Sequence, residues 1–173
     1  MKTFSGPLLL EALVLGALAS MPAASQNDTY QQIDPKYPPD LTAGPTVSVA
    51  GKSAPWKGGE IIVDAAKATK KYAIEGGQCL FPVTYQVRNI GALPSGKFTV
   101  LFKSGATDVT ADSFDSIPPG GVKTKVLTVV FKAGAQSLGL KVDQGDLVKE
   151  GNENNNSSGI RFRVTGSCLP VRV

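Results

Sequence analysis

The sequence has no histidine among its 173 residues. A chain without histidine cannot build a Ser-His-Asp or Cys-His nucleophilic site, and it lacks the commonest protein ligand for metals. Its two cysteines, Cys79 and Cys168, lie far apart, so there is no Cys-x-x-Cys motif. No glycine pair stands between a strand and a helix, as a phosphate-binding loop requires. The sequence therefore predicts a protein that is not an enzyme and has no cofactor.

The chain also has no concentrated charge of one sign. It carries 18 basic and 14 acidic side chains, a net charge of +4, and Lys70-Lys71 is its only basic doublet. Nucleic-acid binding requires a basic stripe, usually with stacking aromatics, so no nucleic-acid partner is expected. Arg161 and Arg163 are predicted to project from one face of the last strand. They could bind an acidic partner or remain solvated.

The only long apolar run lies at the N-terminus. Residues 1–25 combine Lys2, an apolar run from Leu8 to Ala19, and the small residues Ala23-Ala24-Ser25, a pattern typical of a secretory signal peptide. The run is shorter than the roughly 20 residues that cross a bilayer. We therefore expect a secreted or periplasmic protein with no membrane span after signal cleavage, and a retained anchor is the alternative.

Residues 26–45 contain four prolines, which remove backbone donors and fix φ, so this stretch is predicted to be an extended or disordered leader. The folded domain is predicted to occupy residues 46–173. Within it, apolar and polar residues alternate with the period of two that is typical of strands with one buried face. The inward positions are Phe81, Val83, Tyr85, Val87, Phe98, Val100, Phe102, Leu138, Leu140, Val142, Ile160, Phe162 and Val164.

Other segments give weaker signals. Ile61–Val63 is expected to form a short strand, and Asp64–Lys71 could form one or two helical turns with Asp64 as the N-cap. The run from Val122 to Phe131 has apolar residues at both odd and even positions, which predicts a central strand that is covered on both faces for part of its length. Trp56 lies between turn residues, where it either closes one end of the core or stays exposed as a binding anchor.

Several short strands separated by turns predict an all-β fold, an immunoglobulin-like antiparallel β-sandwich of about seven strands. Because successive strands reverse direction, the loops around Leu93, Pro118 and Asn154 should share one pole. Cys79 and Cys168 should lie at the opposite pole, where a disulfide bond is permitted. Cysteines of exported proteins are usually paired, which also favours this bond.

The loop from Asp143 to Asn156 is rich in the oxygen ligands that calcium prefers. The hypothetical calcium ligands are Asp143, Asp146, Glu150 and Glu153. Their spacing differs from that of an EF-hand loop. In the alternative interpretation, the Asp and Asn side chains hold turns by binding backbone amides, and the two glutamates are solvated.

The segments VTYQVRNIGALPSGKF, PPGG, LKVDQGDLVKEGNENNN and GIRFRV together resemble the CARDB family, the cell-adhesion-related domain found in bacteria. The residues that match the family pattern are Val87, Asn89, Gly91, Gly120, Val142, Asp143, Val148, Glu150, Glu153, Asn155 and Asn156. The resemblance spans roughly residues 47–164. It implies an immunoglobulin-like sandwich of exported bacterial proteins with no general catalytic activity. The chain departs from the family in its single copy, its extra segment from Ile61 to Gly77, and its two cysteines.

We therefore expect an exported, non-enzymatic binding or structural module with an unknown protein or cell-surface partner. The candidate contact loops contain Asn89, Leu93, Pro118 and Asn154, because loops on a rigid scaffold are where such folds place recognition. An exposed strand edge is a second candidate surface. The alternatives are a calcium-stabilised adhesion module and, from another class, a small secreted hydrolase that uses two carboxylates, or an inhibitor of one.

Overall fold

The structure is a computed structural model that describes residues 37–171. The predicted signal peptide, residues 1–25, and leader residues 26–36 lie outside the described residues. Within residues 37–171, no helix combines the length and the apolar character that a membrane crossing requires.

Residues 37–171 form ten strands and one 3-10 helix. The first five elements are β1 (Leu41–Val49), β2 (Lys52–Pro55), β3 (Glu60–Asp64), η1 (Ala65–Lys67) and β4 (Lys70–Tyr72). The remaining strands are β5 (Gln78–Asn89), β6 (Phe98–Ser104), β7 (Thr107–Phe114), β8 (Val122–Lys132), β9 (Gly134–Val142) and β10 (Ser157–Thr165).

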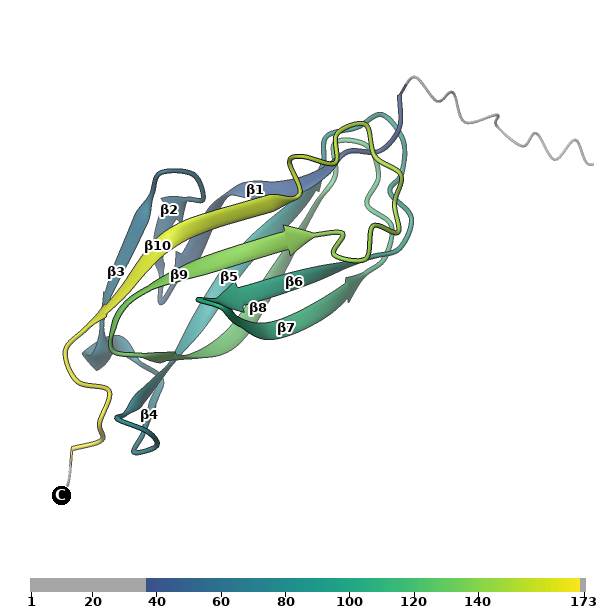
Figure 1. Ribbon diagram of the computed structural model, residues 1–173. Helices are drawn as coiled ribbons and strands as arrows, with labels where there is room; N and C mark the ends of the chain where they lie inside the picture. The colour runs from purple at the N-terminus through teal and green to yellow at the C-terminus, as the bar shows by residue number, and fades with distance from the viewer. Residues whose placement is uncertain (1–36, 172–173) are drawn as a thin grey trace, which may run out of the picture. The chain divides into compact units, whose positions relative to one another are not determined.

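The strands form two sheets that pack face to face as a β-sandwich (Figure 1). In sheet A, β5 lies at the centre, with β1, β2 and β4 on one side and β8 on the other. Sheet B has the order β3-β10-β9-β6-β7. The predicted sandwich class is confirmed. One pair differs from the antiparallel prediction, because β3 runs parallel to β10.

The core lies between the two sheets and contains the side chains that the alternation predicted. Along β5 every second residue from Cys79 to Asn89 is buried, and the residues between them are partly exposed. The inward side chains of β6, β9 and β10 meet them, as in the stacked rings of Tyr85 and Phe102, with centroids 6.0 Å apart. Trp56 is also buried, so it is part of the core rather than an exposed anchor.

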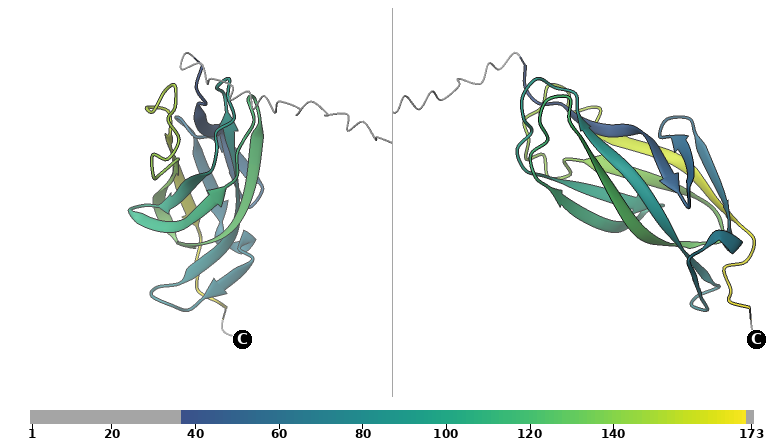
Figure 2. Two further views of the ribbon diagram at one scale, coloured as in Figure 1. Left: turned by 90° about the vertical axis from the view of Figure 1, so that its right-hand side faces the viewer. Right: turned by 180° about the vertical axis from the view of Figure 1, so that it is seen from behind.

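The prediction of a central strand at Val122–Phe131 is wrong. Among residues 37–171, strand β8 pairs only with β5 and forms an edge of sheet A. Sheet A lies in front in the view from behind (Figure 2, right). Its outward residues Val126 and Val130 are 63% and 41% exposed. The apolar residues at the outward positions of this run are therefore valines on the exposed face of the sheet. β-Branched residues favour a strand whether or not that face is covered.

Two further boundaries differ from the sequence expectation. Strand β1 begins at Leu41, so residues 41–45 of the predicted leader belong to the sheet rather than to a linker. In place of the helical turns expected from Asp64 to Lys71, only the short 3-10 helix η1 forms. The Asp64 Oδ1 accepts a hydrogen bond of 2.7 Å from Ala66 N at its start. The chain then enters β4, because Lys70–Tyr72 pair with the start of β5.

Candidate functional site at the loop pole

Three loops gather at one end of the sandwich (Figure 1). They are residues 90–97 between β5 and β6, residues 115–121 between β7 and β8, and residues 143–156 between β9 and β10. Residues 38–40, which precede β1, lie among them and bond to two of the three. We call these four segments the loop pole. The predicted contact residues Leu93, Pro118 and Asn154 therefore lie in one region.

Residues 38–40 join two of the loops through backbone hydrogen bonds. Ile90 N donates to Asp40 O over 2.7 Å, and Ala92 N donates to Pro38 O over 3.3 Å. From the other side, Gly151 N donates to Pro39 O over 2.9 Å. Prolines are compatible with this position, because the segment uses its carbonyl groups as hydrogen-bond acceptors. Pro38 and Pro39 lack an N–H group, and none of these bonds requires one.

Gly91 is the residue that lets this segment approach so closely. A Cβ at position 91 would lie 2.5 Å from Asp40 N and 2.5 Å from the Pro39 carbonyl carbon, and nearer still to Pro38 O. Both neighbours are backbone atoms that cannot rotate away. The loop therefore requires a residue without a side chain at this point.

Asn89 connects the loop of residues 90–97 to the loop of residues 115–121 from inside the pole. Its side-chain amide donates to Leu93 O over 2.7 Å and to Ile117 O over 2.9 Å. Its Oδ1 accepts hydrogen bonds from Asp40 N and Gly91 N. Asn89 is fully buried, so it positions the loops and cannot touch a partner itself.

Glu150 ties the long loop to the start of β1. Its carboxylate accepts hydrogen bonds from the backbone N–H of Leu41 and, over 3.0 Å, from the Asn156 amide. The side chain is buried, not solvated as the sequence suggested. Burial raises the pKa of Glu150 to about 7, the bonds from Leu41 and Asn156 oppose that rise, and the nearby charges of Glu153 and Asp143 add to it.

The four hypothetical calcium ligands are not arranged as a preformed metal site among residues 37–171. Both oxygens of Asp143 accept backbone hydrogen bonds, from Leu147 N over 3.1 Å and Val148 N over 2.8 Å. Among residues 37–171, no three acidic, histidine or cysteine side chains are grouped so that they could hold a metal. Asp143, Asp146, Glu150 and Glu153 are therefore not a preformed set of ligands, and calcium binding by this loop stays a prediction. Asp143 holds a turn instead, as the alternative interpretation expected.

The outer surface of the pole presents apolar side chains. Ile90 is 53% exposed and Leu147 is 67% exposed. Leu147 also lines a surface groove of about 490 Å³, together with Lys97, Phe98, Thr99, Ser113, Phe114 and Asp115. Because Asp115 is the only acid that lines this groove, the groove lacks the two facing acids of a glycosidase.

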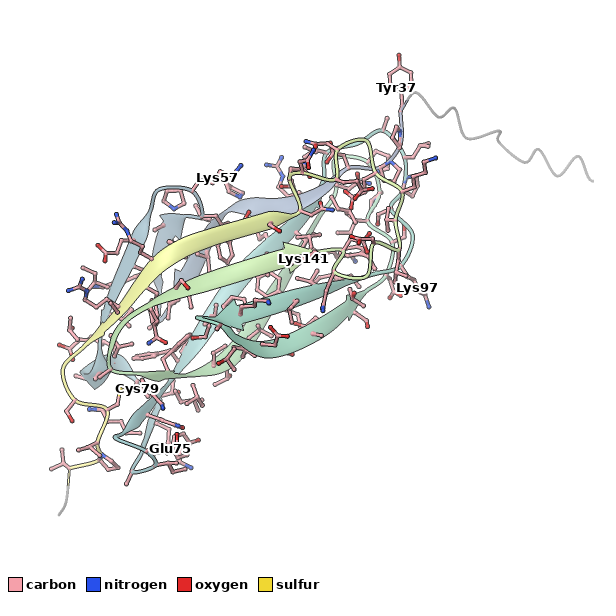
Figure 3. All side chains as sticks on the ribbon, in the orientation of Figure 1. Tyr37, Lys57, Glu75, Cys79, Lys97 and Lys141 are labelled. Atoms are coloured by element: carbon pink, nitrogen blue, oxygen red, sulfur yellow. A yellow bond between two sulfur atoms is a disulfide. The ribbon has the colours of Figure 1, made fainter. Side chains whose placement is uncertain are left out.

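A disulfide bond closes the opposite end of the sandwich. Cys79 near the start of β5 is bonded to Cys168, with a Cα–Cα distance of 5.1 Å, as predicted. Figure 3 shows Cys79 and Tyr37 at opposite ends of the described domain. The bond is reinforced by the Lys71 ammonium group, which donates to Ser167 O over 2.7 Å. The C-terminal segment is therefore fastened far from the loop pole.

Sequence reasoning missed the roles of residues 38–40 and of Glu150. The prolines were interpreted as a linker because composition does not reveal which carbonyl groups accept hydrogen bonds. For Glu150, the available signal was its position in the family pattern between Val148 and Asn156, two residues that are also buried. A glutamate between two inward-facing residues of a loop is a candidate for a buried acceptor.

Comparisons with known proteins agree with this architecture. The CARDB family model matches residues 62–159. Among solved structures, a crystal structure of a CARDB domain from Pyrococcus furiosus, in complex with di-metal ions, has 23% identity and a TM-score of 0.51. The alignment covers 74% of this chain and 90% of that one. No curated protein matches the chain.

Two solution structures resemble the chain at lower TM-scores. One is of the same CARDB domain from Pyrococcus furiosus, with 22% identity, a TM-score of 0.45, and coverage of 73% of this chain and 94% of that one. The other is a domain of a protein described as a cell surface protein, from Methanosarcina acetivorans. It has 22% identity and a TM-score of 0.45, and the match covers 73% of this chain and 92% of that one.

Proposed function

This chain belongs to the CARDB family, and we propose that its domain is an exported, non-enzymatic module that binds a protein or cell-surface partner through the loop pole. The observation that carries the proposal is the construction of the pole. Buried hydrogen bonds fix its loops, and yet Ile90 and Leu147 remain exposed on its surface. Fixed loops lose little conformational entropy on binding, and exposed apolar side chains gain from being covered.

Export is supported by the disulfide bond between Cys79 and Cys168. Structural disulfides persist in oxidising compartments and are rare in the cytosol. The N-terminal pattern of residues 1–25 is consistent with such a route. CARDB is a non-catalytic type of domain, which agrees with a binding role.

A carboxylate hydrolase is less consistent with the grooves on the described surface. The groove at the loop pole is lined by Asp115 alone among acids, and a second groove on sheet B is lined by Glu60 alone. Glycoside hydrolysis requires two carboxyl groups that face each other roughly 5–10 Å apart. Glu150 and Glu153 do approach each other, but Glu150 is buried beneath the pole.

The proposal is tested with the full chain, fluorescently labelled and titrated onto cell envelopes from the source organism. We expect saturable binding that the double variant Ile90→Asp/Leu147→Asp weakens about tenfold or more, because charges replace two apolar contacts. The matched control is Val126→Asp, which changes an exposed valine on the outer face of β8. Equal binding by the pole variant and the control would show that the pole is not the contact surface.

A further inference from the structure

A second surface lies on the outer face of sheet B, away from the loop pole. There a groove of about 520 Å³ runs beside β10 and is lined by Glu60, Ala135, Gln136, Ser137, Arg161, Phe162 and Arg163. The groove has a simple cause. Arg163 stands opposite Ala135 and Arg161 stands opposite Ser137 in the β10–β9 register, so long side chains face short ones.

The two arginines are not used by the fold. Both are exposed, and within residues 37–171 neither guanidinium forms an ion pair or a side-chain hydrogen bond. The four lysines that do form ion pairs, Lys97, Lys103, Lys125 and Lys132, show that acids are available elsewhere on this surface. Arg161 and Arg163 therefore keep ten N–H donors free on one side of the groove, five on each guanidinium.

The spacing of these arginines matches an extended peptide. Residues two apart on a strand lie on the same face about 6.6 Å apart, and carboxylates two apart on an extended partner chain have the same spacing. Each guanidinium can bind a carboxylate through two parallel hydrogen bonds. The small side chains of Ala135 and Ser137 leave space for the partner backbone beside the arginines.

From this arrangement we infer that the groove along β10 binds an extended acidic segment of another protein, with carboxylates at alternate positions contacting Arg161 and Arg163. A second copy of this chain does not supply the match, because no two acids in the sequence are two residues apart. Glu60 is the register partner of Arg161 in the parallel β3–β10 pair. Its negative charge limits where an acidic residue of the partner can lie along the groove. A partner residue beside Glu60 must be neutral or basic.

The test uses the full chain with its disulfide intact and a labelled, end-blocked peptide in which glutamate alternates with threonine. Fluorescence anisotropy at low salt is expected to show binding that the double variant Arg161→Gln/Arg163→Gln weakens about tenfold. The charge-matched control is Lys67→Gln/Lys123→Gln, which removes two exposed positive charges elsewhere and leaves binding within about twofold. Glu60→Gln should strengthen binding, because it removes the one negative charge of the groove.

Three results would overturn the inference. The first is that the peptide does not bind at about 1 mM. The second is that the arginine and lysine double variants weaken binding equally. The third is that polygalacturonate binds more strongly than the peptide, which would assign the groove to anionic polysaccharide. A peptide with glutamine in place of glutamate should not bind. The loop-pole variant Ile90→Asp/Leu147→Asp should keep its peptide binding, so failure of the groove and failure of the pole are separate outcomes. Thermal melts establish that each variant is folded.

Discussion

The backbone N–H of Leu41 donates a hydrogen bond to the Glu150 carboxylate, which joins residues 109 positions apart in the sequence. Through this bond the first strand of sheet A holds the long loop that follows β9. A buried carboxylate is tolerated only where donors satisfy it, and here a backbone amide and the Asn156 side chain do so. Much of the stability of the pole should therefore depend on Glu150.

Replacing Glu150 with alanine is expected to destabilise the domain by roughly 2–4 kcal/mol, because the Leu41 N–H and the Asn156 amide lose their buried acceptor. Urea unfolding measures the difference. Glu153→Ala removes the same charge from an exposed position, with one hydrogen bond from Glu150 N and a long one of 3.4 Å from the Asn156 amide, so its cost should be about 1 kcal/mol or less. Similar losses in the two variants would contradict this role of Glu150.

The stability of the domain should depend on pH through Glu150. Its pKa in the folded state is about 7 because of burial, against an ordinary value of 4.5. The folded state therefore binds this proton more tightly than the unfolded chain does. The resulting stability is complete below pH 4.5 and is lost as the pH rises through about 7.

The free energy of unfolding of the wild type is compared with that of Glu150→Gln at each pH. The other carboxylates are the same in both proteins, so the difference reports the titration of Glu150 alone. Between about pH 4.5 and pH 8 the wild type should lose roughly 3 kcal/mol relative to the variant, as measured by urea unfolding at each pH. Parallel pH profiles for the two proteins would show that the Glu150 carboxyl does not titrate in this range.

Gly91→Ala should loosen residues 38–40 from the loop pole. The added methyl group would overlap backbone atoms of Pro39 and Asp40, which cannot move without breaking the bonds from Ile90 N and Ala92 N. The expected cost is about 2–3 kcal/mol, and the Ile90 and Ala92 amides should exchange with deuterium faster. Gly139→Ala is the matched control, since a Cβ there meets Lys103 Cβ at an ordinary 3.6 Å.

Loss of the disulfide bond should lower stability without changing the loop pole. Cys79 and Cys168 close a loop of 89 residues, and removing that constraint from the unfolded chain corresponds to about 4 kcal/mol. The double variant Cys79→Ala/Cys168→Ala should show this loss in denaturant and no further response to reductant. If reductant leaves the unfolding midpoint of the wild type unchanged, the bond does not stabilise the domain.

Tyr85 should resist ionisation for as long as the domain is folded. Burial raises its pKa, and the neighbouring Asp112 carboxylate raises it further by charge and by accepting the phenol hydrogen bond at 3.0 Å. The difference in absorbance at about 295 nm between wild type and Tyr85→Phe should therefore appear only at the pH of alkaline unfolding, followed by circular dichroism. An earlier difference signal would show that the phenol is solvated.

Part of the fold could be predicted from local pattern alone. The alternation of β5, β6, β9 and β10 gave the correct inward set, because a pleated strand that buries one face must separate apolar from polar residues with a period of two. Chain reversal then placed the three loops at one end and both cysteines at the other. These conclusions need only neighbouring residues and the direction of the strands.

The sequence by itself determined the sandwich, its core and its disulfide, because each follows from local periodicity, from strand direction or from the count of cysteines. Tertiary structure alone decided that β8 is an edge, that residues 38–40 join the loops, and that Glu150 is buried. It also decided that Arg161 and Arg163 find no ion-pair partner within residues 37–171. These properties depend on which distant groups lie opposite a residue in space. A pattern of neighbours along the chain does not encode those partners.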